Sequence, residues 1–263
     1  MPFKARRSKC SAERFAHSVQ HSLLNPASGP NKFGHPSVRS ARLPAMPGAI
    51  DPNLQLALGE LPLFPLRGIV LFPGMALPLH IFEPRYCEMT RDALKSHGCI
   101  SVVHVPCRDA DMRGTPPICR IAGIGTIVEY EELPDGRFHM LLVGRARVKL
   151  DELPFRHPYR RARAEVLECE DSEVHSNDLL ALRSAITAFG RVARKLDPAF
   201  DPTIPEGLPL SAYSDACAAR LLLDATQRQR VLETPSVAAR IHILTEVLTM
   251  QHHDLDLTRP ESN

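Results

Sequence analysis

The dominant period of the hydrophobic pattern changes near Asp171. Before this point apolar and polar residues alternate, as in residues 145–150 and 161–166, which indicates strands with one buried and one solvated face. After it apolar residues recur at steps of three and four, which indicates amphipathic helices. The pattern therefore predicts an α+β protein, with a β-rich part of about 110 residues followed by three or four helices.

Short apolar runs bounded by proline and glycine predict the individual strands. These runs are residues 61–66, 69–72, 76–81, 100–105, 119–131, 137–143, 145–150 and 161–166. Pro134-Asp135-Gly136 predicts a hairpin turn, Gly144 predicts a strand break, and Gly123 and Gly125 predict a bulge or a close backbone approach. Between the strands, Pro84 opens a predicted helix that Gly98 ends.

The second part contains a long apolar seam and two further helical segments. The seam consists of Leu179, Leu182, Ile186, Phe189, Ala193 and Leu196. A second helix is predicted at residues 211–224. Thr234 is a candidate N-cap for the last helix, with Pro235 at its first position.

The charge is distributed unevenly between the first 50 residues and the rest. Residues 1–50 contain eight of the 32 Lys and Arg residues but one of the 30 acidic residues, so they carry a formal +7 and the remainder −5. A mildly acidic body argues against nucleic acid as the main partner. The basic leader, residues 1–55, is either a disordered arm or a targeting segment. A third alternative is that translation starts at Met46 and that the first 45 residues are an artefact of gene calling.

Seven cysteines occur without close pairs, and no secretory segment or apolar run of about 18 residues accompanies them. We therefore expect reduced thiols in a cytoplasmic protein, or an organellar one if the leader targets it. Cys87, Cys99, Cys107 and Cys119, together with His80, His97 and His104, invite a zinc hypothesis. Because close C-x-x-C or H-x-x-x-H spacing is missing, we expect no metal and no cofactor.

Several motifs in a fixed order resemble the amino-terminal, substrate-binding domain of Lon proteases. They are residues 61–66 (LPLFPL), 70–74 (VLFPG), 77–79, 121–126, 133–136, 144–147 and 227–233, with Arg240. The resemblance covers about residues 58–252. It implies a PUA-like fold, in which a twisted antiparallel β-sheet forms a pseudo-barrel with one packed helix and is followed by an α-helical bundle. The expected division is a leader at 1–55, a β-rich subdomain at 58–170, a helical subdomain at 172–252 and a disordered tail at 253–263.

The resemblance also implies a function. It suggests a stand-alone, non-catalytic protein-binding module in proteolysis or protein quality control, which binds unfolded or degron-bearing client polypeptides or acts as an adaptor. Lon or another protease is an expected partner, and self-association is possible. No G-x-x-x-x-G-K-[ST] motif is present, and Lys195 is the only lysine after Ala164, so we expect neither ATP hydrolysis nor peptide cleavage.

Two candidate surfaces follow from these expectations. Phe72, Met75, Leu77 and Tyr86 are predicted to form an apolar rim that binds peptide, unless these side chains cap the sheet core instead. The alternative function is RNA binding through a basic cluster, of which Arg160, Arg161 and Arg163 are the central candidates. The remaining members are Arg145, Arg147, Lys149 and Arg156. A solvated strand face would give the same pattern, and no aromatic residues for base stacking are interleaved.

Overall fold

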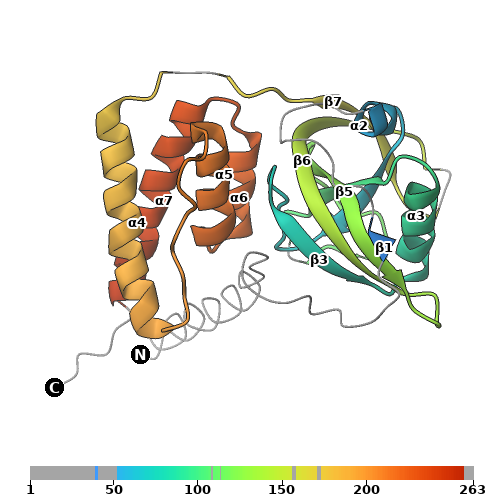
Figure 1. Cartoon of the computed structure of the whole chain (residues 1–263), viewed down its shortest axis with the longest axis horizontal. Helices are drawn as coiled ribbons and strands as arrows, with labels where there is room; N and C mark the ends of the chain where they lie inside the picture. The colour runs from blue at the N-terminus through green and yellow to red at the C-terminus, as the bar shows by residue number, and fades with distance from the viewer. Residues whose placement is uncertain are drawn as a thin grey trace. The chain divides into compact units, whose positions relative to one another are not determined.

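The computed structural model describes residues 39–40, 52–107, 109–112, 114–155, 158–170 and 173–257. Contacts divide the chain into two compact units, and residues 26–168 form one of them (Figure 1). The described part of the other is residues 169–257. Most of the predicted leader and the end of the predicted tail lie outside the described residues. Helix α2 (Pro52–Ala57) buries Leu54 and Ala57, so ordered structure begins before residue 58.

Five strands of the first unit pair in a closed ring, as the pseudo-barrel prediction requires. In ring order they are β2 (Leu61–Leu66), β4 (Cys99–His104), β5 (Ile121–Glu132), β6 (Phe138–Glu152) and β7 (Arg161–Val166), which pairs back with β2. The sheet is mixed rather than wholly antiparallel, because β2 and β4 are parallel. A crossover through β3 (Ala76–Ile81) and α3 (Pro84–Lys95) separates these two strands, and parallel pairing requires a connection of this length.

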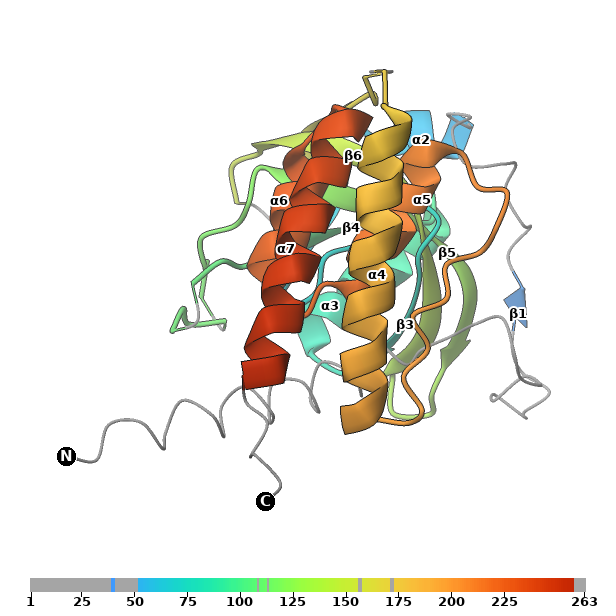
Figure 2. The same cartoon turned by 90° about the vertical axis from the view of Figure 1, so that its left-hand side faces the viewer.

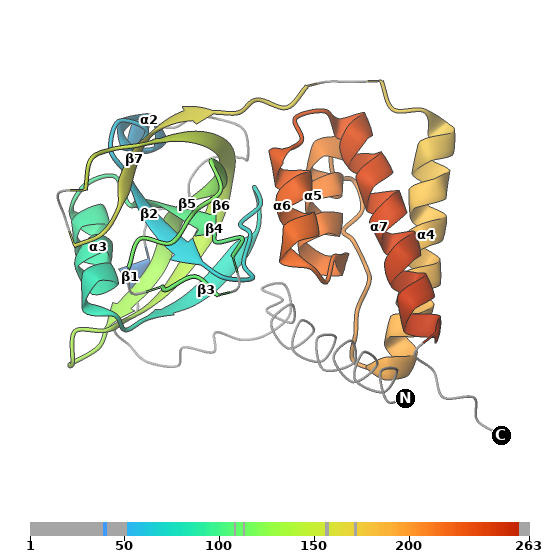
Figure 3. The same cartoon turned by 180° about the vertical axis from the view of Figure 1, so that it is seen from behind.

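Two further strands extend this ring. β3 pairs along the first half of β6, and β1 (Arg39–Ser40) pairs with β5 (Figure 3). A register shift opposite Gly125 leaves Arg145 as the extra residue of a bulge. β6 nevertheless continues through Gly144, so the predicted strand break there is wrong.

Residues 70–72 are buried and Ile69 is half-buried, but the segment is irregular, so the strand predicted for residues 69–72 is wrong. The backbone of Leu71 lies against Gly123 and that of Phe72 lies against Gly144, at positions where a β-carbon on either glycine would overlap a carbonyl oxygen. The close approach predicted at Gly123 is therefore confirmed, and its partner is this segment. An apolar run can be buried by crossing a sheet as well as by joining it, and its sequence does not distinguish the two.

Helix α3 begins at Pro84, as predicted, but its C-cap is Ser96 rather than Gly98. Gly98 follows two residues later with a φ of 69°, and its amide donates a hydrogen bond to the carbonyl of Ala93. Tyr86, Met89 and Ala93 of α3 are buried against residues of β3 and β6, including Ile81 and Phe138. A second apolar cluster, which includes Leu61 and Val148, fills the other end of the ring.

The described part of the helical unit contains α4 (Ser176–Leu196), α5 (Leu210–Leu221), α6 (Ala225–Glu233) and α7 (Val237–Leu257). α4 and α7 lie side by side and run in the same direction (Figure 2). Ser236, not Thr234, caps α7, because its Oγ accepts a hydrogen bond from the amide of Ala239. α7 also extends to Leu257, beyond the predicted end at 252. Within the described residues, no helix is long and apolar enough to span a membrane.

Candidate binding surface

Three of the four residues predicted for an exposed apolar rim are core residues. Phe72, Leu77 and Tyr86 are 1%, 5% and 6% exposed, respectively. Met75 is half-buried and packs against the same core. The rim prediction is therefore wrong for three of its members, because the crossing segment and α3 turn these side chains toward the interior of the ring.

The arginines of the predicted basic patch mostly form hydrogen bonds and ion pairs with carboxylates and a backbone carbonyl of this chain. The guanidinium of Arg160 forms two hydrogen bonds of 2.6 Å to Glu152 and donates another to the carbonyl of Pro116. Arg161 pairs with Glu60 at 2.6 Å. Arg163 is exposed, and faces Asp151 across the β6–β7 pair. These contacts do not favour the RNA alternative, which requires guanidinium groups that are available to phosphates.

The face predicted to be solvated at Arg145, Arg147 and Lys149 is mostly covered. Arg145 and Arg147 are 8% and 2% exposed, whereas Lys149 is exposed. A period of two shows which side chains share a face but not whether that face meets water, and arginine has a long apolar stem that packs well. Arg156 lies outside the described residues.

An accessible apolar surface occurs instead on the outer face of the β3–β6 pair. Cross-strand register places Ala76 opposite Val143, and Pro78 opposite Leu141. All four side chains are half-buried, and none belongs to the core clusters, whereas their sequence neighbours Leu77 and Leu142 point into the core. We call these four residues the β3–β6 strip. An antiparallel sheet whose outer face is apolar differs from the usual pattern of one apolar and one polar face.

One edge of the strip is the outer edge of β3, which within the described residues pairs with β6 alone. The amide of Gly144 donates to the carbonyl of Met75, and hydrogen-bonded pairs alternate with non-bonded pairs from there. The pairs of the strip are therefore non-bonded pairs, whose side chains lie closest together. The nitrogen of Pro78 faces the outer edge, where it removes a backbone donor and limits pairing with another strand.

Histidines and an exposed phenylalanine lie at one end of the strip. His80 faces His139 in the next cross-strand pair, with ring centroids 4.7 Å apart. Phe82 is 61% exposed and stacks on His80 at 6.0 Å. Burial, followed by the charges of His139 and Arg137, lowers the pKa of His80 below its ordinary value of 6.5, and Asp135 opposes this effect.

The other edge of the strip is polar and acidic. On β5, Glu129 lies opposite Leu141, Glu131 lies opposite His139, and Thr126 lies opposite Val143. An apolar strip with a polar border is the arrangement that protein-binding surfaces commonly show.

The sequence contains a signal for the strip that the predictions did not use. Residues 138–143 carry apolar side chains at both alternating sets of positions, since Leu141 and Val143 interleave with Phe138, Met140 and Leu142. A strand of this kind has two faces that favour burial, and the fold covers one of them with its own core.

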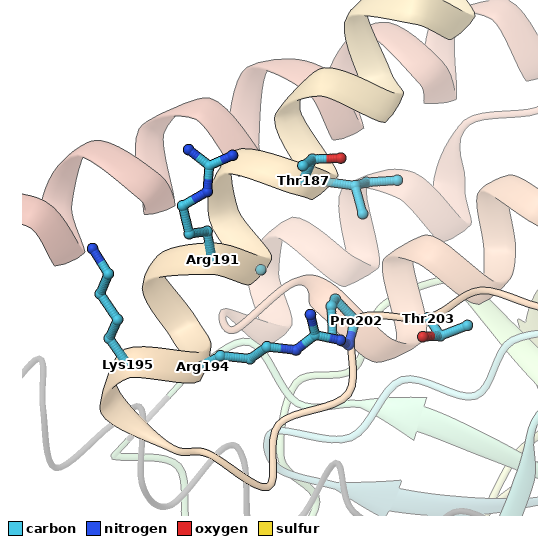
Figure 4. Close-up of a pocket in the computed structure, with 8 residues that line it drawn as sticks. Thr187, Arg191, Arg194, Lys195, Pro202 and Thr203 are labelled. Carbon is cyan, nitrogen blue, oxygen red and sulfur yellow. The ribbon is translucent and has the colours of Figure 1, made fainter.

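A pocket of about 500 Å³ lies in the helical unit, between α4 and the segment that contains Pro202 and Thr203. Its lining includes Arg191, Arg194 and Lys195. Figure 4 shows Arg194 directed toward Pro202, whereas Arg191 and Lys195 extend away from it. The three cations therefore do not converge on one ligand position. In the described part of the chain, no three His, Cys, Asp or Glu side chains lie close enough to hold a metal ion.

Comparison with known proteins identifies matching sequences over most of the chain. The sequence profile described as the ATP-dependent protease La (LON) substrate-binding domain matches residues 60–250. The Lon protease of Heliobacterium modesticaldum is 30% identical over 215 residues, which cover 80% of this chain. The Lon protease of Escherichia coli K12 is 25% identical over 205 residues, 77% of this chain. In both cases the match spans 26% of the protease, so this chain corresponds to about a quarter of its length.

Two solved structures share the fold. A Lon N-terminal domain protein from Xanthomonas campestris superposes with a TM-score of 0.52 at 21% identity, covering 71% of this chain and 97% of that chain. The N-terminal domain of a Mycobacterium avium complex Lon protease gives 0.50 at 15% identity, covering 72% and 98%, respectively. These identities support the shared fold.

Proposed function

The chain belongs to the family of LON substrate-binding domains, and on that premise we propose that it binds exposed apolar segments of other polypeptides through the β3–β6 strip. The family is named for the recognition of substrates in proteolysis, which is the broad role that we assign here. The part of the Lon proteases that this chain resembles is the substrate-binding part, and we propose a role without catalysis.

The observation that carries the proposal is the apolar character of an accessible sheet face. Leu141 and Val143 lie on a strand whose other face already fills the core, so they do not serve that core. Covering them with an apolar partner would remove their surface from water, at about 25 cal/mol per Å².

The strip fits an unfolded segment better than a folded partner. It consists of two neighbouring cross-strand pairs, bounded by the carboxylates of β5 and the outer edge of β3, so it accepts a few apolar side chains. Such contacts select segments for their apolar character rather than for an exact sequence. This selectivity suits a module that binds unfolded or degron-bearing clients. Binding to a short segment through so few side chains is expected in the micromolar range.

A binding assay with a matched control tests the proposal. The probe is a fluorescent, permanently unfolded casein, titrated with the wild-type protein and with a Leu141→Thr/Val143→Thr double variant. Threonine keeps the β-propensity of both positions while it makes the strip polar. We expect affinity to fall at least about tenfold, since two partly buried apolar contacts are each worth about 1 kcal/mol.

Phe155→Ser provides the control. Phe155 is 62% exposed in the same unit but lies outside the strip, so its removal tests whether exposed apolar surface in general binds the probe. The control variant should bind casein as the wild type does. Equal binding by all three proteins would contradict the assignment of the strip, and a lack of binding by the wild type would contradict the proposed function itself.

A further inference from the structure

We propose that the imidazoles of His80 and His139 make binding at the β3–β6 strip dependent on pH, with the neutral pair binding an apolar segment and the protonated pair releasing it. This inference rests on the proposed function and adds a means of regulation to the same surface. It follows from the position of the pair, from the charges around it and from the effect of a bound segment on both.

The pair continues the strip without a break. His80 and His139 form the cross-strand pair that follows Pro78 and Leu141, on the same outer face, and non-bonded pairs of this kind bring side chains together. Their ring centroids are 4.7 Å apart, and the exposed ring of Phe82 stacks on His80. A segment that covers the apolar pairs and reaches Phe82 therefore also covers His80.

Positive charges on the imidazoles of His80 and His139 would repel each other at this separation. Burial has the largest effect in disfavouring a cation at His80, and the charges of His139 on β6 and of Arg137, just before β6, add to it, while Asp135 in the hairpin favours a cation. Glu131 on β5 lies opposite His139. The charges around the pair therefore act on the protonation of His80, which sets the charge of this end of the strip.

A bound apolar segment removes water from the pair, and loss of water disfavours the charged form of histidine. The bound state therefore has the lower pKa at His80, and binding is coupled to the release of a proton. This coupling sets the direction in which affinity changes with pH. Affinity is full above the pKa of His80 in the free protein, which lies below 6.5, and it falls as the pH decreases through that pKa.

The test uses a capped peptide of apolar and neutral polar residues, without titratable groups, so that any pH dependence comes from the protein. Dissociation constants are measured at pH 7.5 and pH 5.5 for the wild type, for a His80→Gln/His139→Gln double variant and for His253→Gln, an exposed histidine of α7. Circular dichroism at each pH distinguishes release of the peptide from loss of the fold.

We expect the wild type and His253→Gln to bind about two- to tenfold more weakly at pH 5.5, since each unit of pKa difference between free and bound protein gives up to tenfold. The double variant should bind at pH 7.5 and change less than about twofold. Wild-type binding that is equal at both pH values would overturn the inference and leave the proposed function standing. A double variant that retains the wild-type pH dependence would do the same, whereas no binding by the wild type at either pH would overturn both.

Discussion

The carbonyl oxygen of Leu71 lies directly over Gly123 of β5, in the space that a β-carbon on that residue would occupy. Phe72 and Gly144 repeat this arrangement on β6. The segment before β3 is thereby fixed across two neighbouring strands. Because β3 begins at Ala76, four residues after Phe72, the two glycines help to define where the β3–β6 pair forms.

Gly123→Ala should destabilise the β-rich unit by about 3 kcal/mol or more, because the added methyl group meets backbone rather than a flexible side chain. Denaturant unfolding of the two proteins measures the difference. Gly114→Ala is the matched control, since its nearest neighbours would lie 3.7 Å away, and it should change stability by less than about 0.5 kcal/mol. Equal stability of the two variants would contradict the packing described at Leu71.

The helical unit contains a buried ion pair, and its loss should lower the free energy of unfolding. Arg240 and Asp215 are 3.5 Å apart with side chains 0% and 4% exposed, and Arg240 also donates to the carbonyls of Thr234 and Pro235. Arg240→Ala leaves a buried carboxylate without its cation and should cost about 3 to 5 kcal/mol in the free energy of unfolding.

The exposed pair of Arg230 and Glu246 offers the comparison within the same unit. Arg230→Ala should cost less than about 0.5 kcal/mol, because solvent screens the two charges. Chemical denaturation followed by circular dichroism measures both variants. A loss of similar size in the two would indicate that burial does not determine the strength of the Arg240 pair.

Burial raises the pKa of Cys217 to about 12, so this thiol stays protonated at neutral pH in the folded protein. Alkylation by iodoacetamide at pH 8 should therefore modify the exposed Cys107 more than about a hundredfold faster than Cys217. Mass spectrometry of the digested protein measures both rates. Comparable alkylation rates for Cys107 and Cys217 in the native protein would contradict the burial of Cys217. Comparable rates are expected only after the protein is unfolded.

The elements of this fold follow largely from local pattern, and the exceptions have local causes. Alternation and turn residues predict β7, the β5–β6 hairpin and α3, because each depends on side chains near in sequence. Residues 69–72 do not follow their pattern, since their burial depends on glycines more than 50 positions later. The parallel pairing of β2 and β4 likewise depends on the crossover as a whole.

The candidate surface was harder to predict than the fold. Phe72, Leu77 and Tyr86 have the apolar character of a binding rim, but the same character suits a core, and the structure places all three there. Leu141 lies on a strand that already has an apolar face in Met140 and Leu142, so its sequence position alone does not mark it as a surface residue. Only the β3–β6 register shows that Leu141 shares its outer face with Pro78.

The most direct test of the β3–β6 strip as a binding surface is the methyl NMR spectrum of the protein during titration with the capped apolar peptide at pH 7.5. We expect the methyl signals of Leu141 and Val143 to shift progressively with peptide concentration, while those of Val148 and Leu150, buried in the other core cluster, remain unchanged. Shifts confined to other residues, with the signals of Leu141 and Val143 unaffected at saturation, would contradict the account.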